Sequence, residues 1–263
     1  METLQAILLG IVQGITEFLP VSSSGHLQIA KALLGVELEN NLLFDVTLHA
    51  ATVLSTIVVL WSEVWRLLKG LFSRRFTSEQ AYVLKIAVSM IPIGIVGFCF
   101  KDRIEAMLNA PWILALVGGM LLLTAALLAF AYYARPREKE QISYRDAFII
   151  GIAQAVAALP GLSRSGSTIA TGLLLGNRKE AVARFSFLMV LAPILGEMML
   201  ETAGGDLTAS VGGAQLTAGF AAAFVTGCAA CKFMLEIVKR GKLIWFALYC
   251  AAAGIVSLFS YFC

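Results

Sequence analysis

The chain has 263 residues, of which 59% are hydrophobic and 14% charged, and its mean hydropathy is +0.84. Soluble domains carry roughly 25% charged residues, so this composition excludes an ordinary soluble protein and predicts an all-α polytopic membrane protein. The formal net charge of +3 excludes little by itself, because the basic residues are spread unevenly along the chain.

The first hydrophobic segment, residues 3–34, is long enough for one membrane span but is interrupted in its middle. It reads GIVQGITEFLPVSSSGH over residues 10–26, so a proline, three serines and a glycine follow one another closely. Proline and glycine break helices. We therefore predict a re-entrant helical hairpin, which enters the membrane and returns to the same side. The start METLQAILLG lacks a basic region, so we expect this segment to be part of the fold and not a signal peptide.

Six other stretches are apolar over about 20 residues, the length needed to cross the hydrocarbon core. A second interrupted segment, residues 145–176, separates the first three from the last three and reads GIAQAVAALPGLSRSGST over residues 151–168. It repeats the Gly-Ile-x-Gln opening, the Leu-Pro pair and the Ser/Gly turn of the first. The six predicted full spans are residues 42–62, 80–100, 111–134, 182–200, 214–236 and 243–262.

Each half of the chain thus has one hairpin followed by three spans. A hairpin does not change sides of the membrane and three spans do, so the second half starts on the side opposite to the first. We therefore predict one membrane domain, residues 1–263, made of two inverted-topology repeats, residues 1–134 and 135–263. The two polar, broken segments predict a binding site at the repeat interface.

The basic residues test this topology. With the N-terminus outside, fourteen Lys and Arg residues fall in the inside loops and two, Lys101 and Arg103, in the outside loops. This asymmetry agrees with the positive-inside rule and predicts that both termini lie outside. The fourteen are Arg66, Lys69, Arg74, Arg75, Arg135, Arg137, Lys139, Arg145, Arg178, Lys179, Arg184, Lys239, Arg240 and Lys242.

Arg164 lies at the predicted tip of the second hairpin, at membrane depth. A charge at the bilayer centre costs roughly 3 kcal/mol or more, so Arg164 needs a cavity or a partner. A guanidinium, neighbouring hydroxyls and the N-terminus of a restarting helix together suit a phosphate group. The alternative is a purely structural pair with a carboxylate. The neighbouring groups are Ser163, Ser165, Gly166, Ser167 and Thr168.

The first turn offers complementary groups. Glu17 precedes the break, with Gln13 one helical turn earlier on the same face. Three roles are open for Glu17: binding a divalent cation that bridges phosphate oxygens, pairing with Arg164, or orienting His26. His26 is a candidate general base or a nucleophile itself, and the serines are candidate nucleophiles or phosphate ligands. For His49 and Asp45, a structural hydrogen bond is at least as plausible as a catalytic role.

At these residues the chain resembles the undecaprenyl-diphosphate phosphatase family of bacitracin-resistance membrane phosphatases. The first motif is Gln13-Gly-Ile-Thr-Glu17 followed by Pro20-Val-Ser22-Ser23-Ser24-Gly25-His26, and the second runs from Pro160 to Thr168. The resemblance implies removal of the terminal phosphate of undecaprenyl diphosphate in the bacterial cytoplasmic (inner) membrane. It also implies inverted repeats, a site opening to the outer face, and Mg²⁺ or Ca²⁺ as cofactor. Gln13 stands where some members have Glu, which leaves Glu17 as the only carboxylate of the motif.

Each candidate residue thereby receives an expected role. We expect no nucleic-acid partner, while a homodimer, the nucleophile (Ser23, His26 or water) and a rival role as lipid-phosphate flippase or anion transporter stay open. The expected catalytic residues are Glu17, Ser23, His26 and Arg164, with Glu17 also the expected metal ligand. The expected substrate-binding residues are Gln13, Ser22, Ser24, Gly25, Ser163, Ser165, Gly166 and Thr168.

Overall fold

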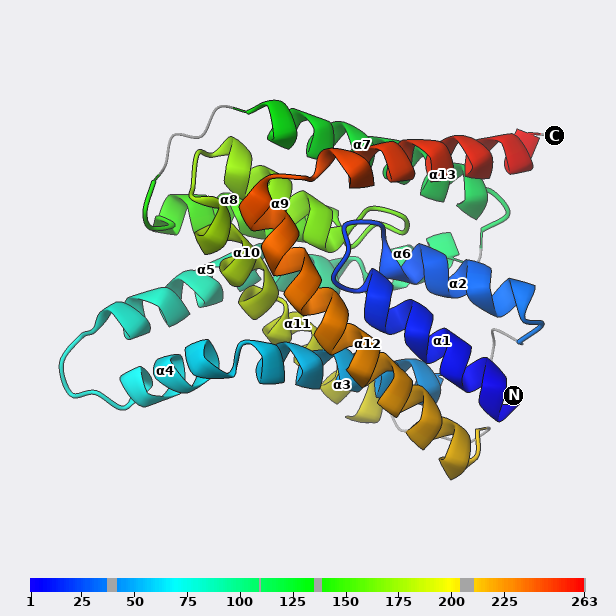
Figure 1. The fold of residues 1–263 in the computed structure, drawn as a ribbon, viewed down its shortest axis with the longest axis horizontal. Coiled ribbons are helices and arrows are strands. Elements are labelled where there is room, and N and C mark those ends of the chain that lie inside the picture. The colour runs from blue at the N-terminus through cyan, green and yellow to red at the C-terminus, as the bar shows by residue number, and fades with distance from the viewer. Residues whose placement is uncertain (37–41, 109, 135–138, 204–210, 263) are drawn as a thin grey trace.

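The computed structural model describes residues 1–36, 42–108, 110–134, 139–203 and 211–262, and within these ranges every named element is a helix (Figure 1). The helices in chain order are α1 (Thr3–Thr16), α2 (Ser23–Leu33), α3 (Leu42–Val59), α4 (Trp61–Leu71), α5 (Ser78–Cys99), α6 (Lys101–Leu108), α7 (Ile113–Tyr133), α8 (Tyr144–Val156), α9 (Arg164–Leu174), α10 (Lys179–Met189), α11 (Leu191–Ala203), α12 (Gly213–Arg240) and α13 (Ile244–Phe262).

Four of these helices are long and apolar enough to cross a membrane, namely α5, α7, α12 and α13. They match the predicted spans 80–100, 111–134, 214–236 and 243–262. The predicted span 42–62 corresponds to α3, which continues into α4 after a bend of 82° and gives a fifth span if the bent pair is counted as one. The described residues therefore form an all-helical protein with four or five candidate membrane spans.

The predicted span 182–200 is not one continuous helix. It is divided at Val190 between α10 and α11, and neither is long enough to span a membrane by itself. Pro193 explains the break, because a proline has no N–H to donate to the carbonyl four residues earlier, here that of Met189, and its ring clashes with that carbonyl. The sequence contains this proline, but the prediction of a single span rested on the apolar character of the whole stretch and did not take the helix break into account.

Both interrupted segments fold as a helix, a turn and a second helix, which confirms the helix breaks predicted at their proline and glycine residues. In the first, Gln5 Nε2 near the start of α1 donates to the Leu34 carbonyl oxygen after α2, at 2.9 Å. In the second, the backbone of Lys139 before α8 exchanges hydrogen bonds of 3.0 and 3.1 Å with Gly176 and Arg178 after α9. The bases of the two hairpins lie toward opposite ends of the molecule, and their turns approach each other in the middle (Figure 1).

The shared Gly-Ile-x-Gln motif has a packing function. A Cβ atom at Gly10 would collide with the backbone oxygen of Gly219 on α12, and one at Gly151 would collide with the backbone oxygen of Ser89 on α5. These glycines let α1 pack closely on α12 and α8 pack closely on α5. Each hairpin therefore rests on a long helix from the other half of the chain, which brings the two turns together.

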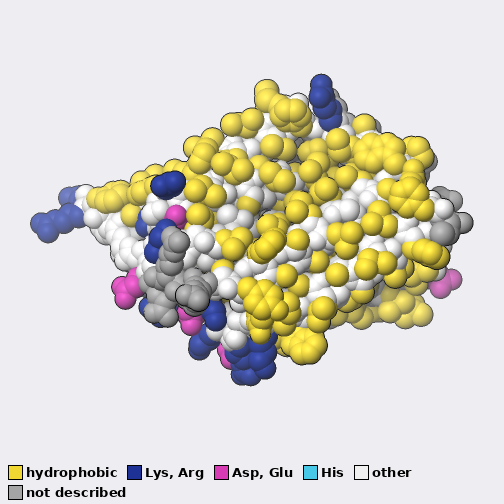
Figure 2. Space-filling model, turned by 90° about the horizontal axis from the view of Figure 1, so that it is seen from above, with side chains coloured by type: hydrophobic (Ala, Val, Ile, Leu, Met, Phe, Trp, Pro, Cys, Tyr) yellow, Lys and Arg dark blue, Asp and Glu magenta, His cyan; other side chains and the backbone are white. Residues whose placement is uncertain are grey.

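Charged side chains gather at one end of the molecule. Figure 2 shows most of the visible Lys and Arg toward the left, with a largely hydrophobic surface between the two ends. At the basic end, Arg184 of α10 pairs with Glu63 of α4 at 2.5 Å, and Lys139 pairs with Asp146 of α8 at 3.1 Å. Both chain termini lie toward the other end (Figure 1). Two of the fourteen predicted inside residues, Arg135 and Arg137, lie outside the described residues.

Candidate active site

Two turns form the centre of the site. Turn one, residues 17–24, joins α1 to α2 and includes the first two residues of α2. Turn two, residues 157–166, joins α8 to α9 and includes the first three residues of α9. Ser165 Oγ donates to the backbone oxygen of Leu19 at 3.2 Å. Gly166 lies against Pro20, where an added Cβ would stand 3.1 Å from the proline Cβ. The turns of the two hairpins are therefore in direct contact, as their predicted role at a repeat interface requires.

The central polar contact joins residues that lie 147 positions apart in the sequence: Arg164 donates to Glu17 Oε1. The other carboxylate oxygen of Glu17 accepts from Gln13 Nε2 at 3.0 Å. Of the three roles left open for Glu17, this geometry realises the pair with Arg164. The side chain of Glu17 is 6% exposed and that of Arg164 is 25% exposed. Because a guanidinium has five N–H donors, Arg164 keeps donors for a ligand.

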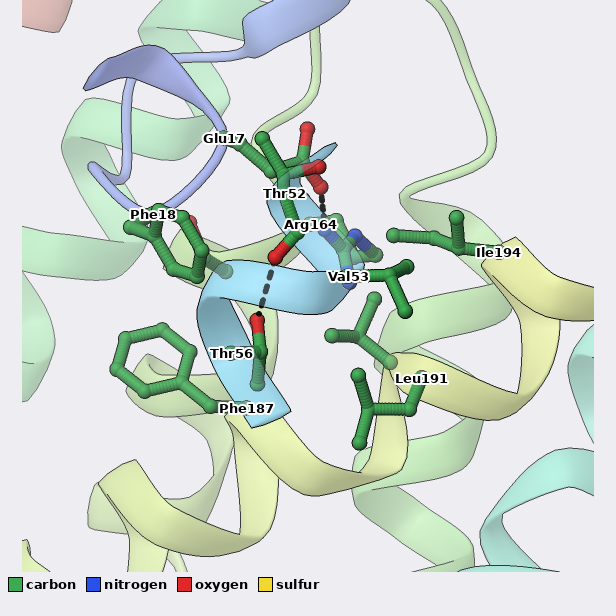
Figure 3. Close-up of a pocket in the computed structure, with 11 residues that line it drawn as sticks. Glu17, Phe18, Thr52, Val53, Thr56, Arg164, Phe187, Leu191 and Ile194 are labelled. Atoms are coloured by element: carbon green, nitrogen blue, oxygen red, sulfur yellow. Dashed lines mark hydrogen bonds and ion pairs between the residues drawn. The ribbon is translucent and has the colours of Figure 1, made fainter. Parts of the chain in front are cut away.

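One side of this ion pair is apolar (Figure 3). Phe18, Val53, Leu191 and Ile194 line a small pocket there, together with Thr52 and Thr56 of α3 and Phe187 of α10. The ring of Phe18 packs edge-on against that of Phe187, with centroids 5.7 Å apart. An apolar surrounding excludes water and strengthens the attraction between the two charges. The pocket therefore holds the Arg164 guanidinium in a defined position.

The start of α9 presents the expected hydroxyls. Ser163 caps the helix by accepting from the backbone N–H of Gly166 at 3.1 Å, and its own N–H donates to Thr124 Oγ1 at 3.1 Å. Its hydroxyl lies 3.4 Å from that of Ser165. Thr168, in contrast, is directed toward α10, where its hydroxyl lies 2.5 Å from Ser186 Oγ. The structure thus brings Ser163 and Ser165 to Arg164, whereas Thr168 packs one turn further into the core.

Turn one contains an unusual backbone conformation. Ser22 has φ of 70° and is the single non-glycine residue with positive φ among those the structure describes. Such a conformation is costly for a residue with a side chain and tends to occur at functional sites. Ser22 is buried, Ser23 is half-buried and Ser24 is exposed. Ser22 Oγ lies 3.5 Å from Ser24 Oγ, and all three serines line the same cavity.

His26 on α2 is oriented by two hydrogen bonds. Its Nδ1 lies 2.8 Å from the backbone oxygen of Ser22, and because a carbonyl only accepts, Nδ1 carries the hydrogen. In the neutral ring Nε2 then accepts, and it lies 2.5 Å from the hydroxyl of Tyr249, whose ring stacks on the imidazole. Within the described part of the chain, His26 makes no contact with Glu17. Sequence reasoning did not identify Tyr249, which is 223 residues away.

A large open cavity of about 770 Å³, the central cavity, connects these groups. Its polar wall comes from turn one, turn two and the start of α9, and its apolar wall comes from α5 and α11. His26 is not part of the wall formed by the described residues. The polar wall contains Glu17, Ser22, Ser23, Ser24, Ser163, Arg164 and Ser165, and the apolar wall includes Met90, Ile93, Val96, Phe98 and Ile194.

Three further polar residues line the central cavity, Thr16 of α1, His49 of α3 and Gln154 of α8. His49 also lies close enough to Glu17 to act on its carboxylate electrostatically, and the side chain of Ser23 interacts with the same carboxylate by hydrogen bonding. The signal for His49 was its rarity, since it is one of two histidines in the chain. Asp45, considered beside His49, pairs instead with Lys31 at 2.6 Å and ties α3 to α2.

The oxygen atoms around Glu17 suit a hard cation shared with a ligand. Gln13 is fully buried and its Oε1 has no hydrogen-bond partner, next to the Glu17 carboxylate. No group of three or more His, Cys, Asp and Glu side chains capable of holding a metal occurs among the described residues. Mg²⁺ is commonly held by one or two carboxylates together with substrate phosphates, so these donors fit a shared site and not an all-protein cage.

Comparison with known proteins is consistent along the whole chain. The model of the family described as "Bacitracin resistance protein BacA" matches residues 6–256. A protein named undecaprenyl-diphosphatase from Parabacteroides distasonis is 59% identical over 98% of both chains, and one from Bacteroides fragilis is 58% identical over the same shares. A more distant undecaprenyl-diphosphatase, from Christiangramia forsetii, is 48% identical, again over 98% of both chains.

Proposed function

The chain belongs to the bacitracin resistance protein BacA family, and from this premise we propose that it is an integral membrane phosphatase acting on undecaprenyl diphosphate. It hydrolyses this lipid to undecaprenyl phosphate and inorganic phosphate, and so returns the lipid carrier to cell-wall synthesis. The protein is a multi-pass bacterial membrane protein. Its four or five candidate spans and its apolar outer surface suit a substrate that resides in the bilayer.

The single observation that carries this function is the contact between the two turns at Glu17 and Arg164. A guanidinium held by a carboxylate, beside hydroxyls and the N-terminus of α9, forms a site for an anion with several oxygens. The central cavity joins this polar site to an apolar wall. A lipid diphosphate matches both surfaces, because its head group is anionic and its tail is a hydrocarbon.

We propose that the diphosphate binds with its terminal phosphate against Arg164, Ser163 and Ser165. Phosphoryl transfer depends mainly on positioning and on neutralising negative charge, which these groups supply. The isoprenoid tail follows the apolar wall, where Ile93 and Val96 of α5 lie. Undecaprenyl phosphate leaves when the bond between the terminal phosphorus and the bridging oxygen breaks.

The nucleophile is Ser23 or a water molecule in this proposal. Ser23 lines the central cavity near Glu17, whereas the Nε2 of His26 is bonded to Tyr249. If Ser23 attacks, a phosphoserine forms and water hydrolyses it in a second step. If water attacks, inorganic phosphate forms directly. In both routes His26 stabilises turn one through its hydrogen bond to the Ser22 carbonyl. Its Nε2 accepts a proton from the reaction only if the hydrogen bond from Tyr249 is first broken.

A divalent cation, Mg²⁺ or Ca²⁺, fits beside Glu17. The Glu17 carboxylate and the unpartnered Oε1 of Gln13 would hold it together with the substrate phosphates. When bound there, it would neutralise part of the phosphate charge. The residues of the chain retain their own functions: Arg164 and the hydroxyls of α9 bind the phosphate and Gln13 orients Glu17.

We also propose the finer topology: six spans and two re-entrant hairpins, arranged as inverted repeats over residues 1–134 and 135–263. In this count the bent pair α3–α4 is one broken span and the divided pair α10–α11 is another. Supporting it are the hairpin bases at opposite ends and the packing of each hairpin on the other half. With the basic end in the cytoplasm, both termini lie outside. The cavity wall includes Phe98 at the end of α5 and Ile104 of α6, so the site opens away from the basic end, toward the outer face.

The function is tested by measuring phosphate release from undecaprenyl diphosphate by the purified protein in detergent. We expect release by the wild type that depends on Mg²⁺ or Ca²⁺ and disappears with a chelator. The Arg164→Ala and His26→Ala variants should both be strongly impaired. Near-normal rates in both variants would sink the assignment, as would a wild-type protein that moves the lipid across vesicles without hydrolysing it.

A further inference from the structure

Gln154 on α8 is a buried polar side chain in the central cavity without a strong partner in the described chain. Its residue is 1% exposed, and its Oε1 has no hydrogen-bond partner. Its Nε2 has one contact, with Met90 Sδ at 4.0 Å, and a thioether sulfur is a weak acceptor. Leaving a buried amide unpaired is unfavourable, so a ligand that enters the cavity is the natural partner.

The other copy of the motif shows what kind of partner this is. Gln13 holds the same place in its Gly-Ile-x-Gln sequence as Gln154 does. The Nε2 of Gln13 donates to the carboxylate of Glu17, one helical turn later, at 3.0 Å. One helical turn after Gln154 stands Ala158, which lines the central cavity. The amide of Gln13 therefore has a carboxylate of the protein as its partner. The amide of Gln154 faces the central cavity at the corresponding position.

The helices that follow the two turns, α2 and α9, begin with different residues. Ser23 is the first residue of α2, and Arg164 is the first residue of α9. Glu17 of the first copy pairs with Arg164 of the second. Ala158 of the second copy corresponds to Glu17, and Ser23 of the first copy corresponds to Arg164. This second pair carries no charge, and both of its residues line the central cavity. One of two equivalent places for an anion is therefore filled by the protein and the other is free.

We propose that Gln154 is a substrate-binding residue and that its amide N–H donates to a non-bridging oxygen of the diphosphate. The phosphate takes the place relative to Gln154 that the Glu17 carboxylate takes relative to Gln13. At that place it also faces Ser23, the candidate nucleophile. The inference rests on the proposed function for the identity of the ligand as a diphosphate, but the binding of an anion by Gln154 is tested separately.

The kinetic test compares the wild type with Gln154→Leu, which keeps the volume and removes the amide, using farnesyl diphosphate as a short-chain substrate. We expect KM to rise about tenfold to hundredfold, the usual effect of losing a hydrogen bond to a charged group, while kcat changes less. Gln141→Leu is the matched control, because Gln141 is exposed and precedes α8. Equal KM values for Gln154→Leu and the wild type would overturn the inference.

A second variant separates an N–H donor from a cation ligand. Gln154→Glu has the same shape but offers only negatively charged oxygens, so it should repel the diphosphate and raise KM at least as much as Gln154→Leu. If this variant has the KM of the wild type and binds the divalent cation more tightly, residue 154 binds the metal. That result would overturn the proposed donor role.

The binding test does not depend on catalysis. Inorganic pyrophosphate should raise the melting temperature of the wild type and of Gln141→Leu in detergent, and should do so much less for Gln154→Leu. If Gln154→Leu melts lower without ligand, Gln154→Met, which preserves length and packs against Met90, replaces it. An undiminished pyrophosphate shift in a well-folded variant contradicts the inference. A wild type that binds pyrophosphate but does not hydrolyse the lipid contradicts the proposed function instead.

Discussion

Turn one and turn two have the same local architecture but different chemistry. Both follow a Gly-Ile-x-Gln helix, and in both a serine precedes the returning helix, Ser22 before α2 and Ser163 before α9. Turn one adds Glu17 and a strained Ser22, whereas turn two adds Arg164 and the positive φ of Gly161, at 90°. Under the proposed function, two hairpins of similar local architecture share one active site, because each provides only part of the chemistry.

The difference extends to how tightly the two turns pack. An added Cβ at Gly25 in the first copy would meet nothing closer than 3.5 Å, whereas one at Gly166 would meet atoms at 3.1 Å. Ser163 caps α9 through its side chain, but Ser22 makes no such bond at α2. The second copy is the more tightly packed of the two. The first copy is more exposed and more strained, which suits the turn that carries Ser23, the candidate nucleophile.

Removing Arg164 should have the largest effect, because it deletes the charge that turn two contributes. For Arg164→Ala we expect a loss in kcat/KM of about a thousandfold or more, as for other arginines that neutralise a transferring phosphoryl group. The assay is phosphate release from undecaprenyl diphosphate. Arg184→Ala is the control, since Arg184 pairs with Glu63 on the exposed basic end and should be nearly wild type. Equal losses in both variants would argue against a special role for turn two.

Ser23 tests whether turn one supplies the nucleophile. We expect Ser23→Ala to lower kcat by about a hundredfold or more, because the attacking oxygen is removed. Ser24→Ala should lower it less than tenfold, because Ser24 is more exposed and its hydroxyl lies 3.5 Å from that of Ser22. Trapping of a phosphorylated protein with wild type but not with Ser23→Ala would establish the covalent route. A mild effect of Ser23→Ala would leave water as the nucleophile.

The packing contrast makes a prediction about stability. Gly161→Ala combines a φ of 90° with a Cβ placed 2.6 Å from the Val117 backbone, so it should destabilise the protein by about 2–4 kcal/mol. Gly25→Ala, whose Cβ would lie 3.6 Å from the Val117 side chain, should cost less than about 1 kcal/mol. Unfolding in detergent followed by circular dichroism measures both. Similar stabilities would contradict the view that turn two is the tighter support.

The smallest expected effect concerns Tyr249. Tyr249→Phe removes the hydroxyl that donates to His26 Nε2 and should lower kcat by about three- to tenfold, the usual value of one hydrogen bond. KM should hardly change, because Tyr249 is not part of the described cavity wall. Tyr261→Phe on the same helix is the control, since Tyr261 is exposed and its ring contacts that of Phe262. A larger loss than that of Ser23→Ala would reverse the assignment of roles in turn one.

Local features of the fold were predictable from the sequence. The four long helices and the two hairpins follow from apolar length and from helix-breaking residues, which act over a few neighbours. The break at Val190 follows the same rule through Pro193, but a hydropathy average over 182–200 conceals it. The bend of 82° between α3 and α4 had no such marker, because no proline or glycine lies at Leu60.

The sequence by itself determined which chemical groups occur at the two turns, since Glu17, the serines and Arg164 all fall on the broken segments. Only the tertiary structure decided their partners: Arg164 with Glu17, His26 with Tyr249, and Gln154 with an open cavity. The physical reason is the separation along the sequence over which each effect acts. Membrane partitioning and helix breaking depend on residues close in sequence, whereas ion pairs and cavities depend on how helices more than a hundred residues apart pack together.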